Sequence, residues 1–205
     1  MKLHTSIGPN PRLVNLFIAE KGLSLPTVMV DIIAGENRRL PFLAMNPAGG
    51  TPVLELDDGT ALAETVAICE WLEEAHPAPA LIGATARERA ITRMWTRRVD
   101  LLVVQPMTAG FRGAEGLPLF KDRLRCLPQA ADDLKLAARE GLAWLDRQLG
   151  ERRYIAGDTV SLADLLLFSF VEFGAQVGQP LDAGNRRLAA WHDRMASRPS
   201  AVATA

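Results

Sequence analysis

The sequence pattern of this chain changes at one cluster of helix-breaking residues, His76-Pro77-Ala78-Pro79. Before this cluster, runs typical of short strands alternate with helical patterns, and no convincing strand pattern follows it. We therefore expect an α/β domain over residues 1–76, a linker over 77–84 and an all-helical domain over 85–205. Two small domains also fit the length of 205 residues.

The expected order of elements in the first domain is β-α-β-α-β-β-α. Asn10 is a suitable N-cap for its first long helix, with Pro11 in the first helical position. Asp57-Asp58-Gly59 has the chemistry of a hairpin turn. A parallel βαβ unit followed by a hairpin and a helix makes a small α/β sandwich. The expected elements are Lys2–Thr5, Arg12–Lys21, Thr27–Ile33, Leu40–Ala44, Val53–Leu56, Thr60–Leu62 and Glu64–His76.

Only helices are expected after the linker. Thr85 and Glu88 form a capping box that opens a long helix through about Met107, and a Gly/Pro-rich loop follows at residues 110–118. Pro128 begins a helix whose apolar stripe stops at Gly150, and a last helix is expected over residues 185–196.

The strongest local signal in the chain is the segment Val160–Leu165. Ser161 is a good N-cap, and Asp164 is spaced to reach back to the backbone N–H of Ser161. Residues 165–173 are apolar nearly all round, so we expect this helix to be the buried axis of the helical domain. We assign Asp164 to folding, not to chemistry.

Charge and composition exclude several function classes. Lys and Arg number 23 against 24 Asp and Glu, so there is no basic field for a nucleic acid. The two cysteines and three histidines lack the spacing of a metal site or a disulfide framework. We see neither a signal peptide nor the ~18 apolar residues of a membrane span. A cytoplasmic protein with no metal and no membrane partner is expected.

Two adjacent motifs in the first domain have the chemistry of an amino-acid site. On the residues alone, Thr51-Pro52 is most simply a trans, edge-strand proline. A cis bond would instead leave the Thr51 backbone free to pair with a peptide-like ligand. Glu64-Thr65 opens a helix, where free N–H groups and the Thr65 hydroxyl can hold a carboxylate and Glu64 an ammonium. Ordinary helix capping is the alternative.

The loop Ser6–Asn10 precedes a helix N-terminus, where helix dipole and backbone donors favour a thiolate. No cysteine lies in this loop, so any sulfur chemistry here must use the thiol of a ligand.

Several motifs together resemble the signature of the glutathione transferase family. The run Asn46-Pro47-Ala48-Gly49-Gly50-Thr51-Pro52-Val53-Leu54 is followed by Asp58-Gly59 and by Leu62-Ala63-Glu64-Thr65. Ala156-Gly157-Asp158 with Ser161–Asp164 resembles the capping box and hydrophobic staple of that family. The motifs come in the family's order and separation, so the resemblance covers essentially the whole chain.

The resemblance implies a thioredoxin-like first domain, a helical second domain, a homodimer and a glutathione site mostly on the first domain. It implies that Pro52 is a cis-proline and that the Thr51 backbone pairs with the cysteinyl part of glutathione. Glu64 and Thr65 would hold the γ-glutamyl group.

The chain departs from the family pattern at the glycyl end of that site. Gly50 stands where related members often have Lys. Arg38 or Arg39 is a candidate to supply the charge for the glycyl carboxylate, with simple surface exposure as the alternative.

The residue that would activate the thiol also departs from the pattern. Gly8-Pro9-Asn10 replaces the usual catalytic Ser or Cys, and the only tyrosine is Tyr154, far along the chain. Asn10, as in some bacterial members, the Ser6 hydroxyl and the backbone amides of the loop are the candidates. The Asn10 side chain has helix capping as its alternative role.

By the same resemblance, the electrophile pocket is expected between the domains, at Ile7, Trp95, Arg98, Met107 and Phe111, with core packing as the alternative for the helical residues. We expect a detoxifying glutathione transferase whose activated thiolate attacks a small hydrophobic electrophile. A glutathione-dependent disulfide or peroxide reductase and a non-catalytic scaffold or regulatory protein are the alternatives.

Overall fold

A computed structural model describes residues 1–204, which divide into two compact units. The first unit comprises Met1–Leu81 together with the C-terminal residues from Pro199, and the second comprises Ile82–Arg198. No helix among the described residues is long and apolar enough to cross a membrane.

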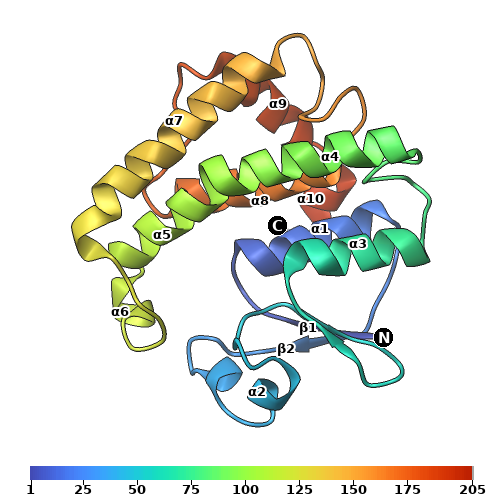
Figure 1. Cartoon of the computed structure of the whole chain (residues 1–205), viewed down its shortest axis with the longest axis vertical. Coiled ribbons are helices and arrows are strands. Elements are labelled where there is room, and N and C mark those ends of the chain that lie inside the picture. The colour runs from blue at the N-terminus through green and yellow to red at the C-terminus, as the bar shows by residue number, and fades with distance from the viewer. Residues whose placement is uncertain (205) are drawn as a thin grey trace. The chain divides into compact units, whose positions relative to one another are not determined.

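The first unit contains a four-stranded mixed sheet with helices on both faces (Figure 1). The strand order is β2-β1-β3-β4, in which β1 pairs parallel with β2 and antiparallel with β3, and β3 pairs antiparallel with β4. The elements are β1 (Lys2–Thr5), α1 (Pro9–Glu20), β2 (Thr27–Met29), the 3₁₀ turn Glu36–Arg38, α2 (Phe42–Met45), β3 (Val53–Glu55), β4 (Ala61–Leu62), α3 (Thr65–Ala75) and α10 (Pro199–Ala203). The predicted thioredoxin-like order is confirmed.

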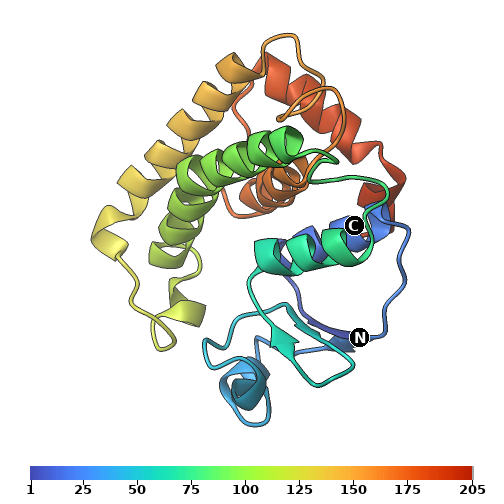
Figure 2. The same cartoon turned by 45° about the vertical axis from the view of Figure 1, so that its right-hand side comes forward.

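Alternation of side chains along the strands builds the two layers of this unit. Leu3 and Leu54 are fully buried, as are the apolar faces of α1 and α3, which lie side by side over the sheet (Figures 1 and 2). On the opposite face, Val53 packs with Val30 and with Phe42 of α2. The sheet is therefore covered by apolar contacts on both faces.

Strand β2 ends earlier than the predicted Thr27–Ile33. The Asp31 carboxylate accepts a hydrogen bond from the Ala34 N–H, and the Glu36 carboxylate accepts one from the Asp31 N–H, both at 2.8 Å. These local bonds turn the backbone away from the sheet, which is the usual action of Asp near a turn.

A buried ion pair joins the C-terminal ends of α1 and α3. The Lys21 ammonium is fully buried against the Glu73 carboxylate and also donates to the carbonyls of His76 and Pro79. Glu73 in turn accepts a hydrogen bond from the Leu81 N–H at 3.2 Å. Because each charge has several partners, this pair fixes the path of residues 76–81.

Helix α10 was not expected from the small-residue sequence of the tail. The Ser200 hydroxyl donates a hydrogen bond to the Glu20 carboxylate, which holds α10 against α1. The C-terminal residues from Pro199, predicted to be part of the helical domain, thus belong to the first unit.

The second unit is entirely helical. Its elements are α4 (Ala86–Val99), a π-helical turn (Asp100–Val104), α5 (Gln105–Gly113), α6 (Leu117–Phe120), a 3₁₀ turn (Pro128–Ala130), α7 (Ala131–Leu149), α8 (Leu162–Gln176) and α9 (Arg186–Ala196). The capping box of Thr85 and Glu88 is confirmed. The predicted loop at 110–118 is wrong in its extent, because α5 continues to Gly113 and α6 begins at Leu117, which leaves only residues 114–116 as a turn.

The π-helical turn joins α4 to α5 where this long helix passes α7. Gly141 of α7 faces the turn, and a Cβ there would lie only 2.1 Å from the carbonyl oxygen of Leu102. Only a residue without a side chain permits this approach of the two helices.

Helix α8 is the buried axis of the second unit, as predicted, with every residue from Leu162 to Val171 buried. The Asp164 carboxylate is completely buried and accepts hydrogen bonds from the N–H of Ile155 (2.8 Å), the N–H and hydroxyl of Ser161 (3.0 and 2.7 Å) and the Trp191 indole N–H (2.9 Å). Burial raises the pKa of this carboxyl, although the donated hydrogen bonds oppose the shift. Asp164 thus connects α8, α9 and the loop before α8.

We predict that Asp164→Ala destabilises the protein by about 3 kcal/mol, because it leaves several buried donors without an acceptor. For a chain of this size, that loss lowers the melting temperature by roughly 6–12 °C, which calorimetry would measure. Asp158→Ala removes an exposed carboxylate from the same loop and is the matched control, with little change expected. Equal melting temperatures for the two variants would contradict the role of Asp164.

Candidate functional site

The pairing register of the sheet brings three distant segments to one edge. Since His4 pairs with Val53 in the antiparallel β1–β3 ladder, continuing the register places Ser6 opposite Thr51. Since Leu54 pairs with Leu62 in the β3–β4 ladder, the same continuation places Pro52 opposite Glu64. The loop after β1, the segment before β3 and the start of α3 therefore meet at this edge, all within the first unit (Figure 1).

The peptide bond between Thr51 and Pro52 is cis. The Thr51 backbone N–H and C=O make no hydrogen bond within the described part of the chain. Thr51 precedes Pro52 and β3, at the edge where Ser6 and Glu64 also lie. The main chain here has a donor and an acceptor available to an extended ligand.

The Ser6 hydroxyl is engaged within the protein. Its Oγ lies 2.6 Å from the Thr51 Oγ1 and 3.1 Å from the carbonyl oxygen of Ile7. A hydroxyl has one proton, so Ser6 can donate to Ile7 while accepting from Thr51, and both contacts are then satisfied. In this arrangement Ser6 fixes the loop against Thr51 and has no proton left for a ligand.

The first turn of α1 has few free backbone donors, because Pro9 and Pro11 have no N–H. Helix α1 begins at Pro9 with Gly8 (φ 114°) as N-cap, so the prediction that Asn10 caps this helix is wrong. The helix begins earlier because Pro9 is already preorganised for the first turn, and Gly8 tolerates its positive φ.

Asn10 consequently has the single N–H among the first three residues of α1. Neither this N–H nor the half-buried carboxamide has a hydrogen-bond partner in residues 1–204. Two donors of one residue, at the positive end of a helix dipole, are free to face an anion.

Helix α3 presents a second set of free donors at Thr65. Its first backbone hydrogen bond runs from the Ile68 N–H to the Glu64 carbonyl at 3.0 Å, which leaves the N–H groups of residues 65–67 to face outward. The exposed Glu64 carboxylate has no ion pair within the described residues. The free N–H groups that begin at Thr65 can bind an anionic group, and the Glu64 carboxylate can pair with a cationic group. The two therefore lie on neighbouring residues.

Glu64 also has an unusual backbone, with φ 67° and ψ 116°. It is the one residue other than glycine with a positive φ in the described chain. Such a conformation costs an L-residue of order 1–3 kcal/mol and tends to persist where a side chain must face a ligand.

Arg38 and Arg39, the two candidates for the glycyl carboxylate, make hydrogen bonds to different segments. Asn37 donates through Nδ2 to the Gly49 carbonyl at 2.6 Å, and Arg38 donates through Nη1 to the Ala48 carbonyl at 3.3 Å, so Arg38 lies across the segment that leads to Thr51. The Arg38 Nε is buried and has no partner. Arg39 instead donates to the carbonyls of Ala34 and Gly35 in its own loop.

Sequence reasoning missed Asn37 and Gly49, which hold Arg38 in place. A Cβ on Gly49 would lie 3.0 Å from both the Arg38 Nη1 and the Asn37 carbonyl oxygen, and φ is 65° there. Glycines in the Asn46–Gly50 turn were visible in the sequence, but nothing local indicated which loop would lie against them.

Ile7 borders an apolar hollow of about 300 Å³ in the first unit. It is 61% exposed, and Met29, Val30, Ile32 and Ile33 form the other apolar walls. An exposed apolar side chain directly after Ser6 is available to an apolar ligand group.

The other predicted electrophile residues belong to the second unit, where they make internal contacts. Trp95 is buried, with its ring 6.0 Å from that of Trp144, and the Arg98 guanidinium lies 4.7 Å from the Trp95 ring. Met107 is buried, and the Phe111 ring packs edge-on against those of Phe120 and Phe173. These contacts are those of a packed interior.

We predict that Glu64→Gly is about 1 kcal/mol more stable than Glu64→Ala, because glycine adopts the positive φ without steric cost. Urea unfolding of the two variants measures the difference. At Glu140, an exposed position in the middle of α7, the same pair should show the opposite order, because glycine is the poorer helix former there. The same order at both positions would argue against strain at Glu64.

Models of two protein families match the chain. The glutathione S-transferase N-terminal domain matches residues 3–80, and the glutathione S-transferase C-terminal domain matches residues 119–199.

Individual relatives match over most of their length. Glutathione S-transferase 2 of Saccharomyces cerevisiae is 35% identical over 203 residues, which cover 96% of this chain and 85% of the yeast protein. Maleylacetoacetate isomerase of Pseudomonas aeruginosa is 31% identical, with 91% of this chain and 87% of that protein covered.

Solved structures agree with these matches. The crystal structure of yeast Gtt2 superposes with a TM-score of 0.93 at 32% identity, with both chains covered completely. A glutathione S-transferase domain-containing protein of Marinobacter aquaeolei gives a TM-score of 0.91 at 34% identity, covering 98% of this chain and 100% of its own. The chain therefore belongs to the glutathione S-transferase family, as the resemblance of its motifs implied.

Proposed function

We propose that this glutathione transferase binds glutathione in an extended conformation along the edge formed by Thr51, Glu64 and Thr65. The observation that carries the proposal is the unpaired Thr51 peptide group at the edge where an unpaired carboxylate and a free helix N-terminus also lie. The Thr51 N–H and C=O pair with the cysteinyl unit, as one strand pairs with another. Pro52 fixes the direction of this segment.

The γ-glutamyl end of glutathione carries an ammonium and a carboxylate on one carbon. Glu64 pairs with the ammonium, while the N–H groups of the first turn of α3 and the Thr65 hydroxyl hold the carboxylate. The contact from Thr65 requires only a hydroxyl, so Thr at this position can replace the Ser that is usual in the family. This division of charge makes the site specific for an α-amino acid group.

Arg38 is our candidate for the glycyl carboxylate. Its buried Nε lacks a partner and its guanidinium already lies along Ala48 and Gly49, close in sequence to Thr51. A guanidinium suits a carboxylate because it donates two parallel hydrogen bonds. Arg39 is the weaker candidate, since its donors are used within its own loop.

We propose that Asn10 stabilises the glutathione thiolate. Its carboxamide and its N–H are both unpaired, whereas the Ser6 proton is used between Thr51 and Ile7. Asn cannot take up the proton, so the thiol proton passes to solvent and Asn10 acts by favouring the anion that remains. The thiolate then attacks the electrophile, forming a sulfur–carbon bond as the leaving group departs with its electron pair.

The small hydrophobic electrophile is proposed to contact Ile7 and the apolar hollow beside it. Trp95, Arg98, Met107 and Phe111 stay part of the predicted electrophile pocket, with less support, because each makes packing contacts within the second unit.

We also propose a cytoplasmic homodimer that acts in detoxification. Both cysteines are free thiols, which suits a reducing compartment.

Leu101 and Leu102 on the π-helical turn, with Met94 on α4, are exposed apolar side chains that a second copy can cover. Light scattering of the purified protein would give the number of copies.

Glutathione binding by calorimetry tests the proposed site. Glu64→Gln should weaken affinity about tenfold or more, because the carboxylate that pairs with the ammonium becomes neutral. Glu74→Gln, an exposed carboxylate near the other end of α3, is the control and should bind as the wild type does.

No binding of glutathione to the wild type would refute the proposal and favour a non-catalytic scaffold. Binding without conjugation of any electrophile, but with reduction of a glutathionylated substrate, would instead favour a reductase.

The role of Asn10 predicts a change in the pKa of the bound thiol. Asn10→Ala should raise that pKa by about one unit, because a hydrogen bond to a charged group is lost. Ser6→Ala should leave the thiol pKa nearly unchanged. Ultraviolet absorbance of the thiolate against pH measures both variants, with Asn15→Ala on α1 as control.

A raised pKa in Ser6→Ala, with none in Asn10→Ala, would transfer the role to Ser6. No change in either variant would leave the backbone N–H of the loop, which both substitutions retain.

A further inference from the structure

The segment that leads from α2 to Thr51 contains two adjacent glycines, Gly49 and Gly50, and pairs with no strand of the sheet. Glycine has more conformational freedom than any other residue, so this glycine pair on its own would be flexible. A ligand that pairs with the Thr51 peptide group would then have to order the glycine pair as it binds, and the affinity would fall.

Side chains supply the order that the glycine pair lacks. Three of them each donate a hydrogen bond to one carbonyl of the segment: Arg38 to Ala48 at 3.3 Å, Asn37 to Gly49 at 2.6 Å and Asn46 to Gly50 at 2.9 Å. The next carbonyl, that of Thr51, makes no hydrogen bond within residues 1–204. The bonds to side chains thus end where the proposed ligand contacts begin.

Asn37 makes the shortest of these three bonds and comes from another part of the chain. It lies in the 3₁₀ turn before α2 and is only 6% exposed, so water does not compete for the Gly49 carbonyl. Asn46 belongs to the segment itself, where its Oδ1 also accepts a hydrogen bond from the Ala48 N–H at 3.2 Å. Asn37 therefore ties the glycine pair to the rest of the first unit.

The two glycines differ in the side chain that they tolerate. Gly49 has φ 65°, and a Cβ there would lie 3.0 Å from the carbonyl oxygen of Asn37. Gly50 has no positive φ, and the nearest atom to a Cβ there would be the Asn46 Nδ2 at 3.8 Å, an ordinary contact. Gly50→Ala thus fits the observed conformation and restricts the freedom of the glycine pair.

We propose that Asn37 is a positioning residue for glutathione binding, which acts without touching the ligand. Its bond to Gly49 holds the glycine pair in the conformation that presents the Thr51 N–H and C=O to the cysteinyl unit. This inference rests on the proposed glutathione site and adds a residue outside the contacts of that site.

Calorimetric titration and steady-state kinetics test this role. Asn37→Ala should weaken glutathione affinity about fivefold, because a buried hydrogen bond that preorganises the site is lost. The KM for glutathione should rise by the same factor while kcat stays unchanged, because the substitution lowers the fraction of preformed sites and not the geometry of the occupied one.

Rescue by Gly50→Ala separates preorganisation from a general loss of stability. Added to Asn37→Ala, it should recover about twofold in affinity, because alanine restricts the backbone that Asn37 no longer holds. In the wild type, where the glycine pair is already ordered, Gly50→Ala should leave the affinity nearly unchanged. Equal effects of Gly50→Ala in the two backgrounds would contradict the proposal.

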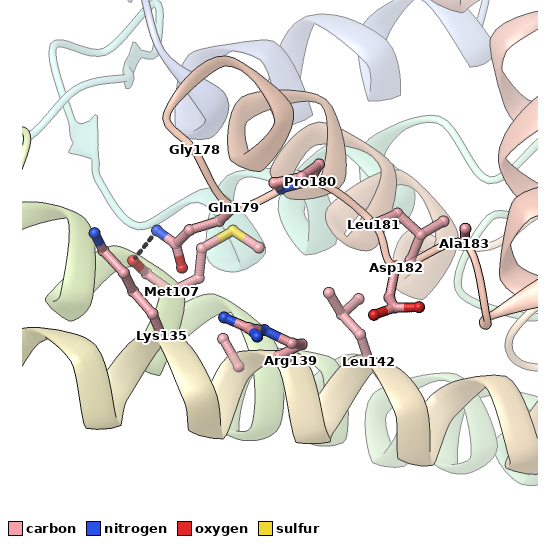
Figure 3. A pocket seen from close by; sticks show the side chains of 11 residues that line it. Met107, Lys135, Arg139, Leu142, Gly178, Gln179, Pro180, Leu181, Asp182 and Ala183 are labelled. Carbon is pink, nitrogen blue, oxygen red and sulfur yellow. Dashed lines mark hydrogen bonds between the residues drawn. The ribbon is translucent and has the colours of Figure 1, made fainter.

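Gln179 of the second unit offers a matched control. Its Nε2 donates to the Met107 carbonyl at 3.2 Å (Figure 3). Among the described residues, the Gln179 Oε1 is buried without a partner, as is the Asn37 Oδ1. Gln179→Ala therefore removes a similar amide away from the glycine pair and should bind glutathione as the wild type does.

γ-Glutamylcysteine shows whether Asn37 acts through Thr51 or through Arg38. This dipeptide lacks the glycyl carboxylate, so Arg38→Ala should weaken only the binding of glutathione. Asn37→Ala should weaken both ligands by the same factor. A loss confined to glutathione would place the effect on Arg38 and overturn the proposal.

Hydrogen–deuterium exchange of residues 46–54 in the ligand-free protein reads the order of the glycine pair directly. These amides should exchange faster in Asn37→Ala and return toward the wild-type rate when Gly50→Ala is added. If Asn37→Ala does not fold, Asn37→Ser takes its place, because its side chain is polar but too short to reach Gly49.

The outcomes separate this role from the proposed function. No glutathione binding by the wild type would refute the proposed function. Normal glutathione binding by the wild type, with equal affinity and equal exchange in Asn37→Ala, would overturn the role of Asn37 alone.

Discussion

The pairing of β3 between β1 and β4 is the constraint on which the candidate site depends. Its register sets Ser6 against Thr51 and Pro52 against Glu64, so three loops from distant parts of the sequence end at one edge. A shift of one residue would turn every strand side chain to the other face and remove Leu3 and Leu54 from the layer that they form with α1 and α3. The burial of the sheet core therefore specifies the geometry of the site as well as the fold.

The starts of α1 and α3 offer different numbers of hydrogen-bond donors to a ligand at that edge. Two prolines remove backbone donors from the start of α1, so its anion-binding capacity depends on Asn10 alone. Helix α3 retains its first N–H groups and adds the Thr65 hydroxyl. A zwitterionic amino-acid group therefore has many partners here, whereas a thiolate has few. We therefore expect the site to contribute more to the binding of glutathione than to the stabilisation of its thiolate.

The sequence predicted those features that depend on short-range chemistry. The capping boxes at Thr85 and Ser161, the buried axis around Asp164 and the order of strands and helices along the first domain were readable, because each follows from residue type at fixed spacing. The residue at which α1 begins could not be predicted, since Pro9 and Pro11 both suit the first turn of a helix. The positive φ of Glu64 and the contact of α10 with α1 depend on the assembled sheet and helices, which no local pattern encodes.

The π-helical turn at Asp100–Val104 has a consequence for comparing this chain with its relatives. An extra residue in a helix rotates everything after it by about 100°, the angle that one residue spans in an α-helix. Helical-wheel projection continued from α4 would therefore assign Met107 to the wrong side of α5. A homologue with one residue fewer in this turn would carry its counterpart of Met107 on a different face of α5, and sequence alignments across α4 and α5 need a gap there to match equivalent positions.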